Sequence, residues 1–384
     1  MAIAKILVVF GTRPEAIKMC PLVKELQSRP DEFETVVCVT GQHREMLAQV
    51  LEVFQVEQDY DLAIMKNGQT LSDVTGEVLR KLPSIFEAEK PDWVVVHGDT
   101  TTAFASCLSA FYHQIPVGHV EAGLRTWDMT SPFPEEFNRQ AVDLLANYYF
   151  APTETSKQHL LDEGKPSDRI SVTGNTGIDA LRTTVTDDFQ NEWADWAADS
   201  RLILVTAHRR ENLGEPMANI FKALRRVVDE NPDVKALYPI HMKPKVRETA
   251  NQYLSGSDRF KLIEPMDVLD FHNMMDRSYL ILTDSGGIHE EAPSLGKPDL
   301  VARNTTERPE GVEAGTLRLV GTNETTLHRA LNTLLKDDAE YRAMSQATNP
   351  YGDGFASRRV ADILSIRTAA LRTRAAKGWR SNGS

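Results

Sequence analysis

The chain alternates short apolar runs with longer amphipathic segments from one end to the other. The runs have the length of strands and the segments the length of helices, an order typical of parallel βαβ units in doubly wound sheets. Two series of expected strands can be separated. They lie at residues 6–10, 35–39, 93–97, 117–120 and 148–151, and at 202–206, 236–240, 260–263, 279–283 and 299–302. The sequence therefore predicts an α/β fold of two Rossmann-like doubly wound domains.

The length of 384 residues also favours two domains, because single hydrophobic cores stop growing below this size. The stretch 183–200 is rich in Thr, Asp and Ala and has no strand pattern, which indicates a boundary. The predicted domains are residues 1–185 and 186–365, followed by a helical tail at 366–384. Because ligands of such folds bind outside the carboxyl ends of the strands, we expect a site in a cleft between the two facing domains.

The composition excludes several classes of partner. A formal net charge of -12 argues against nucleic acid or an anionic membrane as the main partner, although a local basic pocket is compatible with it. The 3 cysteines have no paired spacing, so we expect neither a disulfide framework nor a zinc site. No apolar run approaches membrane-spanning length, and no cleavable signal is recognised at the start. A cytoplasmic location is expected.

An apolar run, a glycine turn and the start of a helix follow one another at 279–296. Ser285, Gly286 and Gly287 form the turn, where glycines let the backbone approach an oxyanion and the helix start favours a phosphate. Glu291 falls just past the first helical turn, where its carboxylate can accept hydrogen bonds from a sugar diol. A nucleotide or nucleotide-sugar site is one interpretation of this segment, and a plain strand-to-helix connection is the other.

Two cations follow the first expected strand. Arg13 and Lys18 stand there without the Gly-x-Gly-x-x-Gly pattern of dinucleotide sites. The start of a helix more often carries acids, so this pair of cations indicates that the turn handles an anion. Surface positions are the alternative interpretation of these two residues.

Acidic side chains follow later strands of the first series, at Asp99, Glu121 and Glu135. Clustered carboxylates raise one another's pKa, which lets one hold a proton while another accepts one. Helix capping by Asp99 and ordinary ion pairs with Arg125 and Arg139 are the alternatives. The cluster indicates acid/base chemistry.

The second series places basic and aromatic residues after its strands. His208 and Arg209 follow the first of these strands and are candidates for stabilising a leaving phosphate by charge or by proton donation. His241 follows the next strand, and Arg308 lies in a polar turn after the last one. Phe271 offers a ring for a planar base, with packing in the core as the alternative interpretation.

Several motifs stand together along nearly the whole chain. They are Gly-Thr-Arg-Pro-Glu-Ala-Ile-Lys at 11–18, Gln-His-Arg-Glu-Met at 42–46, His-Gly-Asp-Thr at 97–100, His-Val-Glu-Ala-Gly-Leu-Arg at 119–125, Pro-Glu-Glu-Phe-Asn-Arg at 134–139, His-Arg-Arg-Glu-Asn at 208–212, Thr-Asp-Ser-Gly-Gly-Ile-His-Glu-Glu-Ala-Pro at 283–293 and Thr-Glu-Arg-Pro-Glu at 306–310. With these motifs the chain closely resembles the non-hydrolysing UDP-N-acetylglucosamine 2-epimerases.

The resemblance implies a GT-B architecture and the reversible conversion of UDP-N-acetylglucosamine to UDP-N-acetylmannosamine, which feeds surface-polysaccharide synthesis. Similar enzymes eliminate UDP from carbon 1 and add it back through a 2-acetamidoglucal intermediate. Neither a nicotinamide nor a metal ion is expected as cofactor. The resemblance also implies a homodimer.

The same resemblance implies roles for the polar turns. The acid/base carboxylates would be Asp99, Glu121 and Glu135, and His208 would aid the departure of UDP. Further residues would line the site or bind the substrate: Arg13, Lys18, Arg209, His241, Phe271, Ser285, Gly286, Gly287, Glu291 and Arg308. Within this set the glycine turn would hold the diphosphate, Glu291 the ribose hydroxyls, and Phe271 the uracil.

The chain departs from the family pattern at a few positions. Glu45 and Gly68 stand where some relatives carry residues that bind a second, activating UDP-sugar, and Lys243 and Lys245 stand where relatives usually have Asn. Two other functions are open alternatives: a hydrolysing epimerase that releases N-acetylmannosamine and UDP, and a GT-B glycosyltransferase. The Arg-Pro-Glu-Ala loop at 13–16 disfavours the first, and the acidic cluster disfavours the second.

Overall fold

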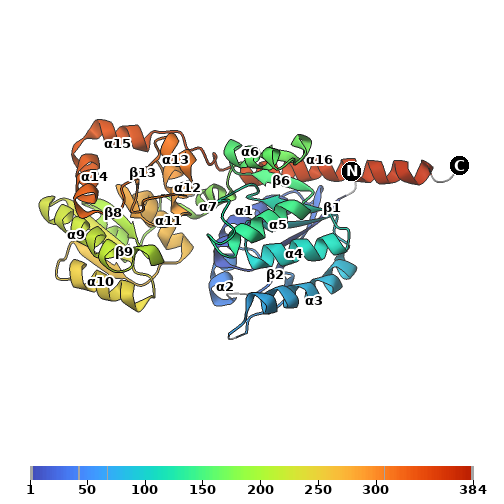
Figure 1. Ribbon diagram of the computed structural model, residues 1–384, viewed down its shortest axis with the longest axis horizontal. Coiled ribbons are helices and arrows are strands. Elements are labelled where there is room, and N and C mark those ends of the chain that lie inside the picture. Colours follow the sequence, from blue (N-terminus) through green and yellow to red (C-terminus); the bar gives the residue numbers. More distant parts are fainter. Residues whose placement is uncertain (1–2, 42–43, 67, 307, 382–384) are drawn as a thin grey trace. The chain divides into compact units, whose positions relative to one another are not determined.

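The structure contains two compact units (Figure 1). This computed structural model describes residues 3–41, 44–66, 68–306 and 308–381. The first unit comprises Met1–Thr183 and Gly352–Ser384, and the second comprises Thr184–Tyr351. Each unit has one sheet of parallel strands with helices packed on both faces. The predicted fold class of two doubly wound α/β domains is confirmed.

The described part of the first unit has a 7-stranded sheet of order β3-β2-β1-β4-β5-β6-β7, with every pair parallel. Its strands are β1 (Ala4–Phe10), β2 (Phe33–Val39), β3 (Tyr60–Asp61), β4 (Trp93–His97), β5 (Val117–Val120), β6 (Tyr148–Ala151) and β7 (Ile170–Val172). Its helices are α1 (Arg13–Gln27), α2 (Arg44–Val53), α3 (Leu71–Glu89), α4 (Thr101–Tyr112), α5 (Glu135–Leu145), α6 (Glu154–Asp162), α7 (Thr176–Thr184) and α16 (Ala356–Ser381), with a 3-10 turn at Ser167–Arg169.

The described part of the second unit has a 6-stranded sheet of order β10-β9-β8-β11-β12-β13, again all parallel. Its strands are β8 (Arg201–Thr206), β9 (Val234–Pro239), β10 (Phe260–Ile263), β11 (Leu280–Thr283), β12 (Asp299–Val301) and β13 (Leu317–Leu319). Its helices are α8 (Glu192–Ala197), α9 (Glu215–Glu230), α10 (Pro244–Leu254), α11 (Val268–Arg277), α12 (Ile288–Glu291), α13 (Pro309–Glu313), α14 (Glu324–Lys336) and α15 (Asp338–Ser345), with 3-10 turns at Arg210–Asn212 and Ala292–Leu295.

The strands are buried on both faces because alternate side chains point to opposite sides of each sheet. In β8, Ile203 and Val205 pack with α9, α10 and α14, while Leu202 and Leu204 pack in a second cluster with residues of α8 and α11. Leu7 of β1 likewise packs with residues of α3 and α4. A strand enclosed in this way exposes polar groups only at its ends, so the ends are where a site can form.

Each sheet has one point at which the strand order reverses direction. In the first unit β1 lies between β2 and β4, and in the second β8 lies between β9 and β11. The connections leave such neighbouring strands toward opposite faces, which opens a crevice at their carboxyl ends. Arg13 and Asp99 follow β1 and β4, and His208 and Ser285 follow β8 and β11. The predicted site residues therefore concentrate at the two switch points.

The division into units differs from the predicted domains. The first boundary lies at 183/184 and was predicted at 185/186, but residues 352–365 belong with the first unit and not with the second. The segment 366–384 is also not a separate tail, because α16 packs on the first unit. Trp93 donates a hydrogen bond from Nε1 to Thr368 Oγ1 at 3.0 Å. The sequence showed the helix but not the surface that it covers.

Three short strands, β3, β7 and β13, were not predicted, since runs of 2 or 3 residues carry too little pattern to be recognised. Gln42 and His43 of the motif at 42–46, and Glu307 of the motif at 306–310, lie outside the described residues. Across the residues that are described, no helix combines the length and apolar character needed to cross a bilayer.

Candidate functional site

Glu121 follows β5 and lies in a polar environment at the end of the first sheet. Its Oε1 contacts Lys18 Nζ and accepts a hydrogen bond from Asn175 Nδ2 at 3.1 Å, and its Oε2 lies 3.7 Å from His97 Nε2. The backbone of Glu121 has a φ of 67°. Residues other than glycine adopt this left-handed conformation at a cost of about 1 kcal/mol. Such a conformation persists only where the surrounding structure fixes it.

Asp99 follows β4, and side chains of helix α5 hold it in place. Arg139 pairs with the Asp99 carboxylate, and Asn138 Nδ2 donates to the Asp99 main-chain oxygen at 2.9 Å. The cap of the helix after β4 is Thr100, whose side chain accepts a hydrogen bond from Ala103 N at 3.0 Å. Asp99 is therefore not the capping residue, while the alternative of an ion pair with Arg139 is present in the structure.

Two adjacent glutamates at the start of α5 have different surroundings. Glu136 is fully buried and accepts hydrogen bonds from Thr126 N at 3.0 Å and Trp127 N at 3.1 Å, so it fixes the loop before α5. Glu135 is partly exposed on the first turn of the same helix. Of this pair, Glu135 is the one available to a ligand.

The predicted cluster of mutually interacting carboxylates is not what the contacts show. Glu121 contacts Lys18 and Asp99 contacts Arg139, so each carboxylate faces a cation. Arg125, the other predicted partner of these acids, pairs instead with Asp143 and Glu163. At the strand ends, each of these acidic side chains is therefore paired with a basic one.

His97, the last residue of β4, is a buried neutral base beside Glu121. Burial lowers the pKa of His97 from 6.5 to about 4, and the nearby Glu121 carboxylate only partly opposes this effect. Within the part of the chain that the structure describes, its Nε2 has no hydrogen-bond partner. The ring therefore adds a polar, uncharged group to the surroundings of Glu121.

The loop after β1 is fixed by a buried carboxylate. Glu15 accepts hydrogen bonds from Gly11 N at 3.0 Å and Thr12 N at 2.8 Å. The Thr12 side chain in turn accepts a hydrogen bond from the main-chain N–H of Glu15 and so caps α1. Thr100 Oγ1 also donates to Glu15 at 2.6 Å, which ties the loops after β1 and β4 together. Arg13 begins α1 next to this connection, with a half-buried side chain.

In the second unit, Asp284 organises the loop after β8. Its fully buried carboxylate accepts the main-chain N–H of His208 at 3.0 Å and of Arg209 at 2.9 Å, and Asn212 Nδ2 donates at 3.0 Å. Arg209 Nε donates in turn to the Asp284 main-chain oxygen at 3.1 Å. This one residue joins the strand end that carries His208 to the strand end that carries the glycine turn.

His208 and His241 form a stacked pair of rings with centroids 5.1 Å apart. Burial lowers the pKa of His208, with further lowering by His241, Lys243 and Arg209, while Asp284 acts in the opposite direction. The pKa of His241 is also lowered, by burial and by Lys243. Both rings are thus biased toward the neutral form before any anion binds.

The glycine turn is lined by guanidinium groups. A Cβ at Gly286 would stand 2.8 Å from Arg308 Nη1 and 3.6 Å from Arg209 Nη2. Arg308 is held in turn by Glu290, which accepts from its Nε at 2.6 Å. The helix after the turn, α12, has only 4 residues before the 3-10 turn, so the predicted helix dipole is weak and the arginines supply most of the positive charge.

Glu291 is the last residue of α12 and lies near α11. Its Oε2 is 3.7 Å from His272 Nε2, and the other ring nitrogen of His272 lies 2.7 Å from Thr184 Oγ1. Phe271, on the same helix, is half-buried and packs against the cluster that contains Met266 and Ile288. Part of its ring therefore contacts the core of the second unit, and part is exposed.

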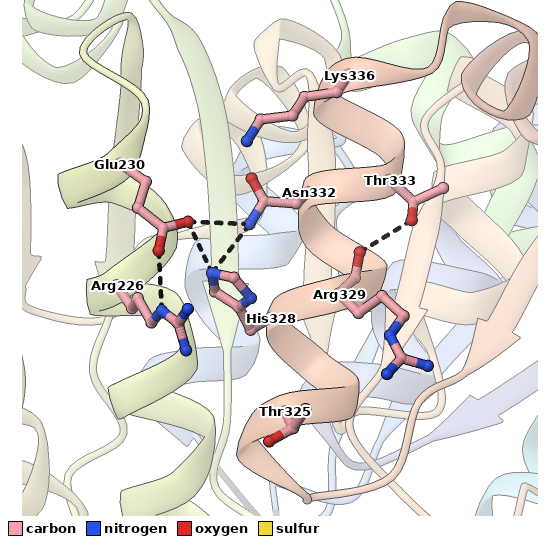
Figure 2. A pocket seen from close by; sticks show the side chains of 8 residues that line it. All are labelled: Arg226, Glu230, Thr325, His328, Arg329, Asn332, Thr333 and Lys336. Atoms are coloured by element: carbon pink, nitrogen blue, oxygen red, sulfur yellow. Dashed lines mark hydrogen bonds and ion pairs between the residues drawn. The ribbon is translucent and has the colours of Figure 1, made fainter.

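An open groove lies elsewhere on the second unit, between α9 and α14 (Figure 2). Glu230 accepts from Arg226 Nε at 2.8 Å, lies 2.8 Å from His328 Nε2, and accepts from Asn332 Nδ2 at 3.3 Å. None of the predicted site residues lines this groove. Among the described residues, no group of three or more His, Cys, Asp or Glu side chains is arranged to hold a metal ion.

Comparison with known proteins identifies the family. The family described as UDP-N-acetylglucosamine 2-epimerase matches residues 24–365. The chain is 58% identical over 360 residues to the UDP-N-acetylglucosamine 2-epimerase of Bacillus subtilis, covering 94% of each. The chain belongs to the UDP-N-acetylglucosamine 2-epimerase family. The predicted family is confirmed, and with it the enzyme class, since these epimerases are isomerases.

Two solved structures of this family extend the likeness to the fold. A putative UDP-N-acetylglucosamine 2-epimerase of Listeria monocytogenes has a TM-score of 0.90 and 53% identity, covering 94% of this chain and 95% of that one. The epimerase of Neisseria meningitidis, solved with UDP-GlcNAc bound, has a TM-score of 0.85 and 47% identity, covering 94% of this chain and 99% of that one.

Sequence reasoning missed three residues that organise this epimerase-family site. Asn175 was not chosen as a candidate, although it comes shortly after β7 and contacts Glu121. His97 and Asp284 lie inside motifs that were recognised, but neither was chosen as a candidate. All three lie at or just after the end of a strand, so inspecting every strand end would have found Asn175 once β7 was known.

The depressed pKa of His97 predicts a loss of stability in acid. The unfolded chain binds a proton at this residue near pH 6.5, whereas the folded chain does so only near pH 4. As the pH falls through this window, the free energy of unfolding should drop by about 3 kcal/mol on account of His97 alone. Urea unfolding of the native protein and of His97→Gln at several pH values measures this difference. Parallel curves for the two proteins would contradict the prediction.

The glycine turn predicts opposite effects for two adjacent substitutions. Gly287→Ala meets no atom within 4 Å and keeps a helical backbone, so it should stabilise the protein by about 0.5–1 kcal/mol. Gly286→Ala displaces Arg308 and weakens its contact with Glu290, so it should destabilise the protein by about 1 kcal/mol. Thermal melting of the two variants checks this, with Gly287→Ala as the matched control. Equal melting temperatures would count against the close approach at Gly286.

Proposed function

We propose that this chain catalyses the reversible epimerisation at carbon 2 that interconverts UDP-N-acetylglucosamine and UDP-N-acetylmannosamine. Membership of the epimerase family supports the activity. The observation that supports the chemistry most is the setting of Glu121, whose carboxylate at the end of β5 contacts Lys18, Asn175 and the neutral ring of His97.

The reaction cannot begin by removing the proton from carbon 2, because no carbonyl adjoins that carbon and the resulting carbanion would be unstabilised. In the proposed route the bond between carbon 1 and the UDP oxygen breaks, and UDP leaves with the electron pair. The proton on carbon 2 passes to a carboxylate, and its bonding electrons form the double bond of 2-acetamidoglucal. Delivery of a proton to the opposite face and re-addition of UDP complete the epimerisation.

In the first unit, we assign acid/base work to three carboxylates: Asp99, Glu121 and Glu135. Arg139 pairs with Asp99 and Lys18 pairs with Glu121, so each of these two carboxylates has a cation beside it. Glu135 stands on the first turn of α5, partly exposed and ahead of the structural Glu136. Lys18 and Arg13 supply positive charge at the same strand ends.

In the second unit, we assign the departing UDP to the glycine turn and its neighbours. Arg209 and Arg308 flank Gly286 and would balance the charge that develops on the diphosphate. A bound diphosphate brings negative charge to His208 and raises its pKa, which makes the ring a better donor when UDP leaves. Ser285, Gly287 and His241 complete this part of the site, as Phe271 and Glu291 do for the uridine.

Two further expectations accompany this function. A homodimer is expected from the family resemblance, and light scattering at twice the mass of one chain would establish it. A cytoplasmic location fits the substrate class and the three free, buried cysteines Cys20, Cys38 and Cys107. Fractionation of cells that produce the protein tests this expectation.

The elimination route predicts exchange of one specific hydrogen. Incubation with UDP-N-acetylglucosamine in deuterated water should yield both UDP-sugars with deuterium at carbon 2, because the proton removed from that carbon is replaced from solvent. NMR of the sugar signals measures the mixture and the exchange together. Release of free N-acetylmannosamine would instead identify a hydrolase, and consumption of substrate only with an added acceptor would identify a transferase.

Asp99→Asn should lower kcat by about 10²–10⁴-fold, because the amide keeps the size of the side chain but cannot take a proton. Asp162→Asn is a suitable control, since Asp162 is an exposed residue of α6 whose side chain accepts a hydrogen bond from Gln158. Turnover and melting temperature should both stay near the native values in this control. Near-native turnover of Asp99→Asn would remove Asp99 from the chemistry.

A further inference from the structure

His119, in the middle of β5, contacts helix α5 with one ring nitrogen and the loop after β4 with the other. Nδ1 lies 2.6 Å from Asp143 Oδ1, and Nε2 lies 2.9 Å from the main-chain oxygen of Gly98. The side chains of His119 and Asp143 are fully buried. Neither residue contributes a group to the reaction described above.

Both ring nitrogens of His119 face oxygen atoms that accept hydrogen bonds. The Gly98 carbonyl can only accept, so Nε2 must donate to it. Although burial raises the pKa of Asp143, contacts with His119 and Arg125 hold it below its usual value. Asp143 also accepts Gly123 N at 3.1 Å. The ring therefore lies between two fixed acceptors, the carboxylate on α5 and the carbonyl in the loop after β4.

Arg125 completes the surroundings of Asp143. Arg125 Nη2 lies 2.8 Å from Asp143 Oδ2, and Arg125 Nε lies 2.6 Å from the partly exposed Glu163. A buried charge is tolerated when it is paired and its hydrogen bonds are satisfied, and the Asp143 carboxylate meets both conditions.

This buried pair holds the two loops that carry Asp99 and Glu121. Gly98, whose carbonyl accepts from His119, directly precedes Asp99. Gly123, whose N–H donates to Asp143, stands two residues after Glu121 in the loop that keeps Glu121 left-handed. Gly98 and Gly123 are thus both fixed by one pair of side chains, His119 on β5 and Asp143 on α5.

We propose that His119, held between the Asp143 carboxylate and the Gly98 carbonyl, is a positioning residue that sets the carboxylates of Asp99 and Glu121 relative to each other. This inference rests on the proposed roles of those two carboxylates. Displacing a reacting group by about 1 Å costs on the order of 10²-fold in rate. The pair of His119 and Asp143 therefore controls kcat, because it holds the loops that carry the two carboxylates. Substrate binding by the second unit does not depend on it.

Two substitutions separate the two hydrogen bonds of His119. The amide nitrogen of Asn occupies the place of Nδ1, so His119→Asn keeps the donor to Asp143 and loses the donor to Gly98. The amide nitrogen of Gln reaches the place of Nε2, so His119→Gln keeps the donor to Gly98 and leaves Asp143 with one contact fewer. A charged acceptor that loses a partner costs more stability than a carbonyl does.

We expect the variant with the larger loss of kcat to be the one with the smaller loss of stability. His119→Asn should lower kcat by about 10²-fold with KM within about threefold, whereas His119→Gln should keep kcat within about fivefold and melt at the lower temperature. A purely structural role makes kcat follow the melting temperature. Equal kcat values, or kcat losses that follow the melting temperatures, would overturn the proposal.

Nitrogen-15 NMR of the native protein tests the contact with Gly98 directly and does not require any variant to fold. Nε2 of His119 should carry a proton, because the Gly98 carbonyl that it faces can only accept. An Nε2 without a proton would overturn the proposal. The exposed contact between His328 and Glu230 is the matched control, and His328→Gln should leave kcat and KM unchanged (Figure 2).

Asp99→Asn, assayed in parallel, separates the two levels of inference. If Asp99→Asn is inactive while His119→Asn is normal, the positioning role fails and the proposed chemistry stands. If Asp99→Asn is fully active, the acid/base assignment fails, and the role of His119 in positioning Asp99 fails with it.

Discussion

Burial of both sheets on both faces is the constraint from which the site follows. Strands enclosed by helices carry mostly apolar side chains along their length, so polar chemistry collects where the strands end. The reversal of strand order next to β1 and next to β8 then selects one end region in each unit. Arg13, Asp99, His208 and Ser285 all belong to these two regions, although they are far apart in the sequence.

In each unit a buried carboxylate, rather than the reacting group itself, holds neighbouring strand ends together. Glu15 joins the loops after β1 and β4, Asp143 joins the loops after β4 and β5 through His119, and Asp284 joins the loops after β8 and β11. Carboxylates suit this task because two oxygens accept several main-chain N–H groups at once.

Much of the fold and part of the site were predictable, for identifiable reasons. Apolar runs such as 202–206 are long enough to be recognised as strands, whereas β3 has only 2 residues. Lys18 and Glu121 were identified because they follow strands within recognisable motifs. Asn175 was missed because β7 was missed, and the role of Asp284 depends on hydrogen bonds to main-chain N–H groups that no sequence pattern specifies.

The return of α16 to the first unit has a consequence for the connectivity of the chain. The first unit is a discontinuous domain into which the second, residues 184–351, is inserted. Two covalent crossings, at 183/184 and at 351/352, therefore tether the units, and any hinge must bend both together. A fragment cut at the first crossing would lose the helix that covers Trp93, while the inserted domain is one uninterrupted piece of polypeptide.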